Sequence, residues 1–128
     1  MYMKVLTQGH KYELADFEAS EVNNVDVYGH QTIQFIEKKS VTDCRLANHP
    51  IPDHLIGPDK LDEMVTVNNG TTNEEVLEML IDRMKYLQAK FPCKENACCI
   101  THLEEGLMWL EKRTRDCIKR GVEGKHTA

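Results

Sequence analysis

The clearest pattern in the chain runs from Asn96 to Arg120, where apolar or small residues recur at helical spacing among mostly polar and charged ones. Charged side chains fill most positions between the apolar ones, no proline interrupts the run, and Gly121 is a typical residue to follow a helix. The apolar or small residues recur in steps of three and four, as on one helix face, at Ile100, Leu103, Leu107, Leu110, Thr114 and Cys117. The pattern predicts one long helix with an apolar seam.

Three large apolar residues, Leu107, Met108 and Trp109, are consecutive within this predicted helix. Successive helix positions point about 100° apart, so the three side chains cannot share one narrow seam. We therefore expect a second buried surface on the same helix.

An apolar stripe earlier in the chain predicts another helix over about residues 72–91. Thr72 and Glu75 have the spacing of a capping box at its start. Phe91 precedes Pro92, which disfavours helical angles and ends the helix. The stripe consists of Val76, Leu77, Leu80, Ile81, Met84 and Leu87.

The long helix is expected over about residues 95–120. Asn96 can cap its first turn, although the helix could also begin slightly earlier, near Lys94 and Glu95. Because few residues separate the two helices, they should fold back on each other as an antiparallel hairpin.

Alternating apolar and polar residues in the N-terminal half predict a small antiparallel sheet. Its best strand is residues 31–38, in which Ile33 and Phe35 lie on one face. The other expected segments are short strands at 4–6 and 12–17, a turn at 7–10, and a loop or hairpin end at 18–26. So few strands need a helix over one face to be stable.

Residues 40–63 carry several prolines among polar residues, and we expect an insertion with little regular structure there. A last strand is predicted at 65–67. A tight turn should follow at 68–70, because asparagine and glycine tolerate positive φ.

Taken together, these patterns predict an α+β fold. A small N-terminal antiparallel β-sheet, residues 1–67, is followed by a C-terminal antiparallel helical hairpin, residues 68–128. With 128 residues, the chain is long enough for one cooperative domain and too short for two independent cores.

Charge is unevenly distributed along the chain. The net charge is −5, which argues against general binding to nucleic acid, yet residues 111–125 alone carry +3. A basic end on an acidic protein favours a local anion site. Cations at a helix C-terminus are, however, also common for purely structural reasons.

Cysteine usage and apolar content bear on the compartment. The five cysteines are an odd number and include an adjacent pair, which does not fit a disulfide framework. No apolar run is long enough for a membrane span, and no signal peptide is recognisable. We expect a reducing cytoplasm.

Metal-binding and catalytic patterns are weak. No C-x-x-C motif occurs, and the only suggestive cluster is Cys98, Cys99 and His102. Glu104 and Glu105 are adjacent and point apart on a helix, so they cannot form a facing acid–base pair. We expect no metal, no cofactor and no catalytic residues.

Several residues of the hairpin could bind a phosphorylated, base-bearing small molecule. Aromatic rings can stack on a base, guanidinium groups can bind phosphate oxygens in pairs, and an asparagine can bind a base edge. The candidates are Arg83, Tyr86, Phe91, Lys94, Asn96, Arg113, Arg115, Lys119 and Arg120. The alternative is that these are ordinary surface and core residues.

Three stretches resemble the phage Thoeris anti-defence sponges, which sequester cyclic ADP-ribose signals. They are KVLTQGHKYEL (4–14), NGTTNEEVLEMLIDRMKYL (69–87) and the stretch 91–124. The last contains P-x-[KR]-E-x-A at 92–97, then T-x-L-E-E-[AG]-x-M-W at 101–109, with Gly106 at the position where a neighbouring sponge has alanine. A similar hairpin occurs in anti-CBASS sponges, which bind cyclic di- and trinucleotides.

The resemblance implies a nucleotide-binding, non-enzymatic protein of a phage, acting in the cytoplasm of the infected bacterium to keep the immune effector inactive. It implies a homo-oligomer, dimer or hexamer, with ligand pockets shared between subunits and no DNA or membrane partner. Tyr86 and Asn96 would contact the base, and Arg83, Arg113 and Arg115 the phosphates. Arg115, Lys119 and Arg120 are candidates for a second, cyclic-oligonucleotide site.

Two other functions remain open from the sequence. One is an enzyme that cleaves the same signal. The other is a helical-hairpin module that binds a host protein.

Overall fold

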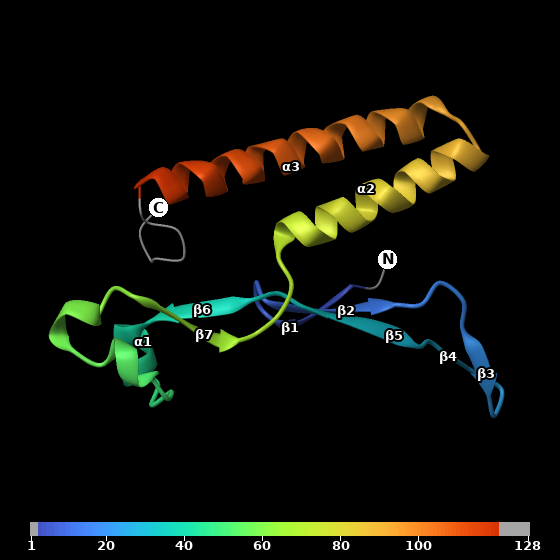
Figure 1. Ribbon diagram of the computed structural model, residues 1–128. Coiled ribbons are helices and arrows are strands. Elements are labelled where there is room, and N and C mark those ends of the chain that lie inside the picture. The colour runs from blue at the N-terminus through green and yellow to red at the C-terminus, as the bar shows by residue number, and fades with distance from the viewer. Residues whose placement is uncertain (1–2, 121–128) are drawn as a thin grey trace. The chain divides into compact units, whose positions relative to one another are not determined.

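The structure is a computed structural model that describes residues 3–120, with only the backbone of Arg120 (Figure 1). Short strands lie between Lys4 and Asn68, and two long helices follow them, which confirms the α+β class. In chain order the elements are β1 (Lys4–Thr7), β2 (Lys11–Ala15), β3 (Ser20–Val22), β4 (Val25–Val27), β5 (His30–Gln34), β6 (Glu37–Ser40), α1 (Val41–Leu46), 3-10 turns at Asp53–Leu55 and Pro58–Lys60, β7 (Met64–Asn68), α2 (Asn73–Lys90) and α3 (Lys94–Arg120).

Residues up to 37, together with 66–71, form one compact unit. Its centre is an antiparallel sheet in the order β1-β2-β5. The register places Val5, Tyr12 and Ile33 side by side, so they share one face of the sheet. The Tyr12 ring packs edge-on against Phe35, with centroids 5.9 Å apart.

The predicted strand at 31–38 is in fact two strands, β5 and β6, with a break at Phe35 and Ile36. The break occurs because the backbone changes partners there. Phe35 donates its N–H to the His10 carbonyl (2.7 Å), whereas Ile36 donates to the Thr71 carbonyl (2.9 Å). A periodicity of apolar residues does not reveal such a change of partner.

The connection after β7 is tight for a different reason than expected. Among the described residues, Asn68, Asn69 and Gly70 all have ordinary negative φ angles, so the prediction of positive φ was wrong. Gly70 instead lies directly against the backbone of β5. A Cβ on it would overlap the Gln34 carbonyl oxygen and lie 2.7 Å from the Phe35 carbonyl carbon.

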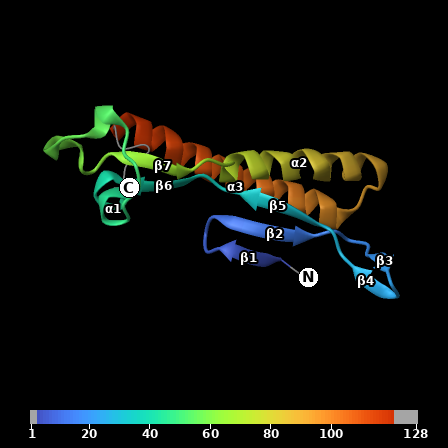
Figure 2. The ribbon, with the colours of Figure 1, turned by 90° about the horizontal axis from the view of Figure 1, so that it is seen from below.

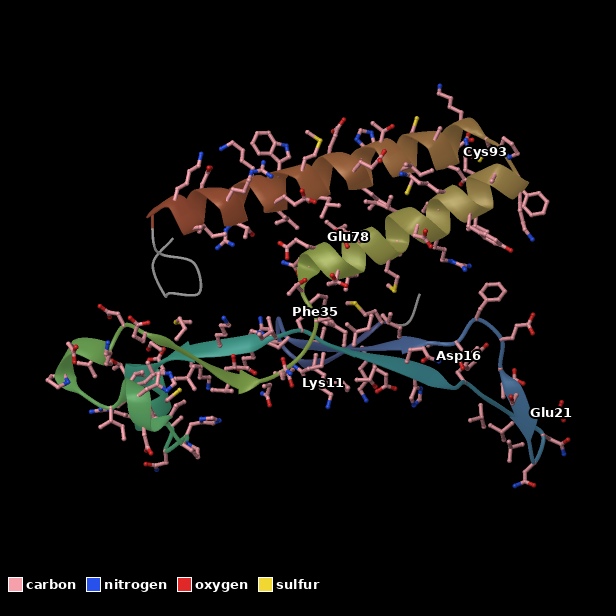
Figure 3. All side chains as sticks on the ribbon, viewed as in Figure 1. Lys11, Asp16, Glu21, Phe35, Glu78 and Cys93 are labelled. Carbon is pink, nitrogen blue, oxygen red and sulfur yellow. The ribbon has the colours of Figure 1, made fainter. Side chains whose placement is uncertain are left out.

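Between β2 and β5 the chain forms a separate two-stranded hairpin, β3–β4, which we call the arm (residues 20–27). Asn23 and Asn24 make its turn with φ angles of 52° and 62°. Two consecutive left-handed residues are typical of the two-residue hairpin turn, for which asparagine is well suited. The arm extends past the ends of β2 and β5, with Glu21 on it (Figure 3).

The second compact unit comprises residues 38–65 and, within the described chain, residues 72–120. Contrary to the prediction for residues 40–63, this region contains the helix α1. Ser40 caps α1 by accepting the Asp43 N–H (3.1 Å), and Val41 and Cys44 are fully buried. The Ser40–Asp43 spacing is a helix-start signal that the sequence analysis missed.

The helices α2 and α3 lie side by side and antiparallel in both views (Figures 1 and 2). Their bounds are within about a residue of the expected ranges 72–91 and 95–120. Gly121, expected to end α3, lies outside the described residues.

We predict that Gly70→Ala lowers the free energy of unfolding by about 1–3 kcal/mol, because its methyl group cannot fit against β5. Denaturant unfolding measures the change. Gly106→Ala is the matched control. Its new methyl would meet only Leu77 Cδ1, at 3.9 Å, so it should raise stability by up to about 1 kcal/mol through helix propensity. Equal effects of the two substitutions would contradict this explanation.

Candidate functional site: the helical hairpin

The first helix of the hairpin begins and ends as its sequence predicts. Thr72 has extended backbone angles, and its hydroxyl accepts the N–H of Glu75 (3.2 Å). Phe91 leaves helical angles at the residue before Pro92, while its N–H still bonds to the Leu87 carbonyl (2.8 Å). Local sequence therefore fixes the length of α2.

Cys93 caps the second helix, in place of Asn96. Its Sγ accepts the backbone N–H of Asn96 (3.4 Å), and its own N–H donates to the Gln88 side-chain oxygen (3.0 Å). The prediction of Asn96 as the cap was wrong, and the alternative start near Lys94 is confirmed. Three residues, 91–93, thus suffice to reverse the chain between the helices.

The seam predicted on α3 is confirmed. Ile100 and Cys117 are buried, and the four seam positions between them are half-buried. On α2 the buried residue is Ile81, with Leu77, Met84 and Leu87 half-buried around it. Lys85 of α2 and Glu104 of α3 form an ion pair across the hairpin, with Nζ and Oε2 3.4 Å apart.

The second buried surface expected on α3 is absent from the described chain. Trp109 is 71% exposed, because the seam that contacts α2 lies on another side of α3, and Met108, at the border of the groove between the helices, is 67% exposed. Large apolar side chains this exposed near the middle of a helix indicate a surface that a partner covers.

The predicted ligand residues fall into two groups. The turn group consists of Phe91, Lys94 and Asn96 at the helix reversal, with Tyr86 and Arg83 about one and two turns before the end of α2. The end group consists of Arg113, Arg115, Lys119 and Arg120. The side chain of Arg120 lies outside the described residues. Asn96 is half-buried and the other described members are exposed.

Within the turn group, Tyr86 is 56% exposed and Phe91 73% exposed, so both rings can accept a stacking partner. The Lys90 ammonium lies 4.9 Å from the centre of the Tyr86 ring. A cation beside this ring adds positive charge where an anionic ligand would sit.

Asn96 and Arg113 lie too far apart on one chain for a single small ligand to contact both. They are separated by 17 positions of one continuous helix, which is about 25 Å. A site that uses both of these residues therefore needs a second copy.

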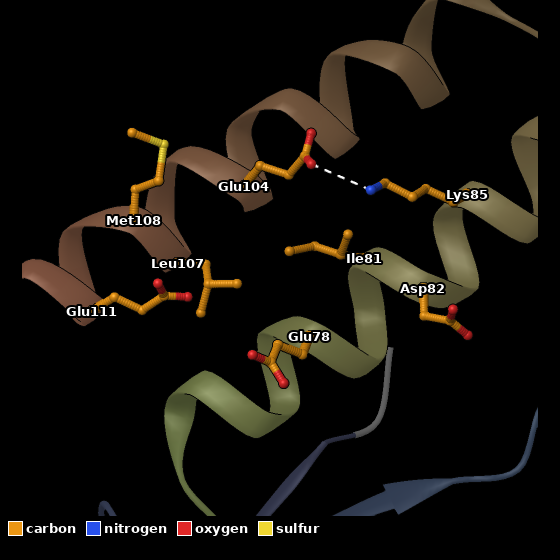
Figure 4. A pocket seen from close by; sticks show the side chains of 8 residues that line it. All are labelled: Glu78, Ile81, Asp82, Lys85, Glu104, Leu107, Met108 and Glu111. Atoms are coloured by element: carbon orange, nitrogen blue, oxygen red, sulfur yellow. Dashed lines mark ion pairs between the residues drawn. The ribbon is translucent and has the colours of Figure 1, made fainter.

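The groove between the helices has the opposite charge from the one expected of a phosphate site. A cavity of about 380 Å³ has Ile81, Leu107 and Met108 as its apolar lining (Figure 4). Its charged lining is four carboxylates and one cation: Glu78, Asp82, Glu104, Glu111 and Lys85. This groove repels an anionic ligand, and none of the predicted ligand residues lines it.

A hollow on the outside of α3 does contain a predicted residue. It has a volume of about 300 Å³, and Arg115 lines it together with Trp109 and Lys112. Lys112 also pairs with Asp116 (2.7 Å). Sequence reasoning missed Trp109 as a functional candidate because a lone tryptophan in an apolar triplet is typical of a core.

The cysteines and histidines form no metal site within residues 3–120, since no three potential ligands there lie close enough together. His102 instead lies 3.7 Å from Glu105, one turn along α3. No helix in this part of the chain is both long and apolar enough to cross a membrane.

Two comparisons identify similar proteins. Residues 39–115 match the family described as the Acb2/Tad1 hairpin domain. A 59-residue stretch is 54% identical to Thoeris anti-defense 1 of Bacillus phage SBSphiJ7, covering 45% of this chain and 42% of that protein. The similarity to this relative thus spans less than half of its length.

We expect Cys93→Ala to destabilise the protein by about 1 kcal/mol, since it removes the side chain that caps α3. Cys93→Ser is the control, because a hydroxyl is a better cap acceptor and should keep or raise stability. Urea unfolding of the three proteins measures this. If serine costs as much as alanine, the thiol is not a cap.

Proposed function

Because the chain belongs to the Acb2/Tad1 hairpin-domain family, we propose that it is an anti-defence sponge. It binds cyclic ADP-ribose signals of TIR-based (Thoeris) immunity and holds them without chemical change. The observation that carries this proposal is the 54% identity to a Thoeris anti-defense protein. It acts in the cytoplasm of the infected bacterium, where the signal is made.

A homo-oligomer with shared pockets explains why large apolar residues of α3 are exposed and why the predicted ligand residues fall into two separate groups. Met108 and Trp109 lie exposed, midway between Asn96 and Arg120. Antiparallel pairing of two copies around them places the turn group of one copy beside the end group of the other. At each site one copy then supplies the turn group and the other supplies the end group, and the paired helices cover the exposed apolar residues.

The chemistry of the two groups suits a cyclic pyrophosphate that carries a base. Tyr86 stacks on the base and Asn96 binds its edge, while Arg113 and Arg115 of the other copy bind phosphate oxygens. Arg83 provides a further cation near the turn. The acidic groove beside the site disfavours more extended polyanions such as DNA.

Sequestration requires affinity and no catalysis. A Kd near 1 nM corresponds to about −12 kcal/mol, which a few stacked rings and paired guanidinium contacts can supply. We therefore propose that the protein holds its ligand without catalysing a reaction.

The hollow beside Trp109 favours a second ligand class. Arg115 and Lys112 lie there beside an exposed indole ring on which a base can stack, and Glu105 and Glu111 also line the hollow, so its charged residues are two cations and two carboxylates. Lys119 and Arg120 follow within about one helix turn. We therefore propose binding of CBASS cyclic oligonucleotides as a second candidate function of the same chain.

The function is tested by incubating the protein with cyclic ADP-ribose isomers, denaturing the complex with heat, and analysing the released ligand. We expect tight binding and full recovery of intact ligand. At a 1,000-fold ligand excess over Kd, the bound protein should gain about 4 kcal/mol of stability. A cleaved product would instead identify an enzyme, and no stabilisation by any cyclic nucleotide would favour the protein-interaction module.

Tyr86→Ala and Arg113→Ala should each weaken cyclic ADP-ribose binding at least about tenfold, through lost stacking and a lost charged hydrogen bond respectively. Calorimetry measures the affinities. Tyr28→Ala and Arg45→Ala are matched controls, since both residues are exposed and lie outside the hairpin. Controls that lose as much affinity as the site variants would refute the assigned contacts.

A further inference from the structure

One face of the arm is acidic and the other is apolar, and the side chains on both faces are exposed. In the register of β3 and β4, Glu21 lies directly opposite Asp26 on one face. The other face carries Val22, Val25 and Val27, which are 52%, 60% and 47% exposed. Facing carboxylates repel each other, and a lone two-stranded hairpin is marginal in water. The arm therefore needs a partner that is basic on one face and apolar on the other.

Backbone hydrogen-bonding groups on the outer edge of β4 have no strand partner within the described chain. The two-residue turn at Asn23 and Asn24 makes Val22 and Val25 a hydrogen-bonded pair, so Asp26 belongs to a pair that is not hydrogen-bonded. The N–H and C=O of Asp26 thus point away from β3. Within the described chain, β4 pairs only with β3.

Backbone bonds in the three-stranded sheet determine which groups of β1 are free. Asp16 donates its N–H to the Gly29 carbonyl (2.8 Å), and His10 accepts the N–H of Phe35 (2.7 Å). These bonds show that the even-numbered residues of β2 direct their backbone groups toward β5. The odd-numbered residues of β2 therefore bond to β1.

Glu13 is one of those residues, and its partner in β1 is Lys4. Lys4 consequently directs its backbone groups inward, while Met3 and Val5 direct theirs to the free edge of the sheet. Met3 and Val5 are 59% and 49% exposed. Met3, Lys4 and Val5 thus follow one another along this edge. The side chain of Lys4 lies on the opposite face of the sheet from those of Met3 and Val5.

We propose that the arm of one copy adds as a parallel strand to the β1 edge of a second copy. Asp26 lies beside Lys4, and Val25 and Val27 lie beside Met3 and Val5. In a parallel ladder one residue bonds to the two residues that flank its neighbour. The N–H of Asp26 therefore donates to the Met3 carbonyl, and the Val5 N–H donates to the Asp26 carbonyl.

Only this pairing satisfies three requirements together. Parallel alignment uses the groups that are free on both edges, places opposite charges side by side, and continues the apolar face. The antiparallel alternative would pair Asp26 directly with Val5 or Met3, because those are the residues with free groups, and would place a carboxylate on the apolar face.

The same chain cannot make this contact. With β4 beside β1, the arm would lie three strand spacings from β5, which is about 14 Å. Only Tyr28 and Gly29 lie between Val27 and His30, and this link spans at most about 11 Å. The partner is therefore a second copy, which carries the matching β1 edge.

This contact is independent of the proposed ligand function. It lies wholly outside residues 39–115, which match the hairpin family, and it involves neither helix. Because an arm and an edge are different surfaces, the contact is heterologous and closes as a reciprocal pair or a ring. It adds a second way for copies to associate, besides pairing of the hairpins.

Hydrogen exchange resolved to single amides, on the full chain at increasing protein concentration, tests the proposal. The amides of Asp26 and Val5 should become protected together as concentration rises. Asp26→Lys or Lys4→Asp alone should shift the required concentration upward about tenfold or more. The double variant, and an equimolar mixture of the two single variants, should recover protection.

Glu18→Lys is the matched control, because it makes the same charge reversal at an exposed residue outside the arm and the β1 edge, and it should keep the protection. The proposal is overturned if exchange of Asp26 and Val5 does not depend on concentration. It is equally overturned if Glu18→Lys and Asp26→Lys have the same effect, or if the double variant fails to recover. None of these outcomes depends on a nucleotide ligand.

Discussion

Packing of α2 against α3 along one apolar seam is the constraint from which the other properties of the hairpin follow. The seam uses one side of α3 from Ile100 to Cys117, so the opposite side cannot also face α2. Trp109 is therefore exposed as a direct consequence of the packing that stabilises the hairpin. A helix of this length, about 40 Å, presents that exposed side over its whole extent.

The charged side chains are also distributed unevenly along the hairpin. Carboxylates from both helices meet along the groove, whereas Arg113 and Arg115 lie toward the C-terminal end of α3. A single hairpin is thus unsuited to an anion in its middle and has only half of a site at each end. Antiparallel association of two copies combines the halves, and the binding function becomes a property of the assembly. The arm offers an additional contact through the β unit.

Local patterns in the sequence were sufficient to predict the hairpin. The three-and-four spacing, Thr72 and Pro92 set the helices and their seam because these signals act over one or two turns. Features that depend on distant contacts were not predictable in this way. The strand break at Phe35 depends on Thr71, and the space at Gly70 depends on Gln34. The Cys93 cap was missed because cysteine is a rare cap residue.

The candidate site was predictable in its residue types and not in its geometry. Sequence reasoning selected arginines, aromatic rings and Asn96, but only the helix length shows that one chain keeps Asn96 and Arg113 about 25 Å apart. The most direct measurement is complementation between two defective variants, Tyr86→Ala and Arg113→Ala, refolded together and titrated with cyclic ADP-ribose. If each site is shared between copies, the mixture regains about one quarter of the wild-type sites, because half of the dimers are mixed and each has one intact site. A mixture that binds no better than either variant alone would show that the site lies within one chain.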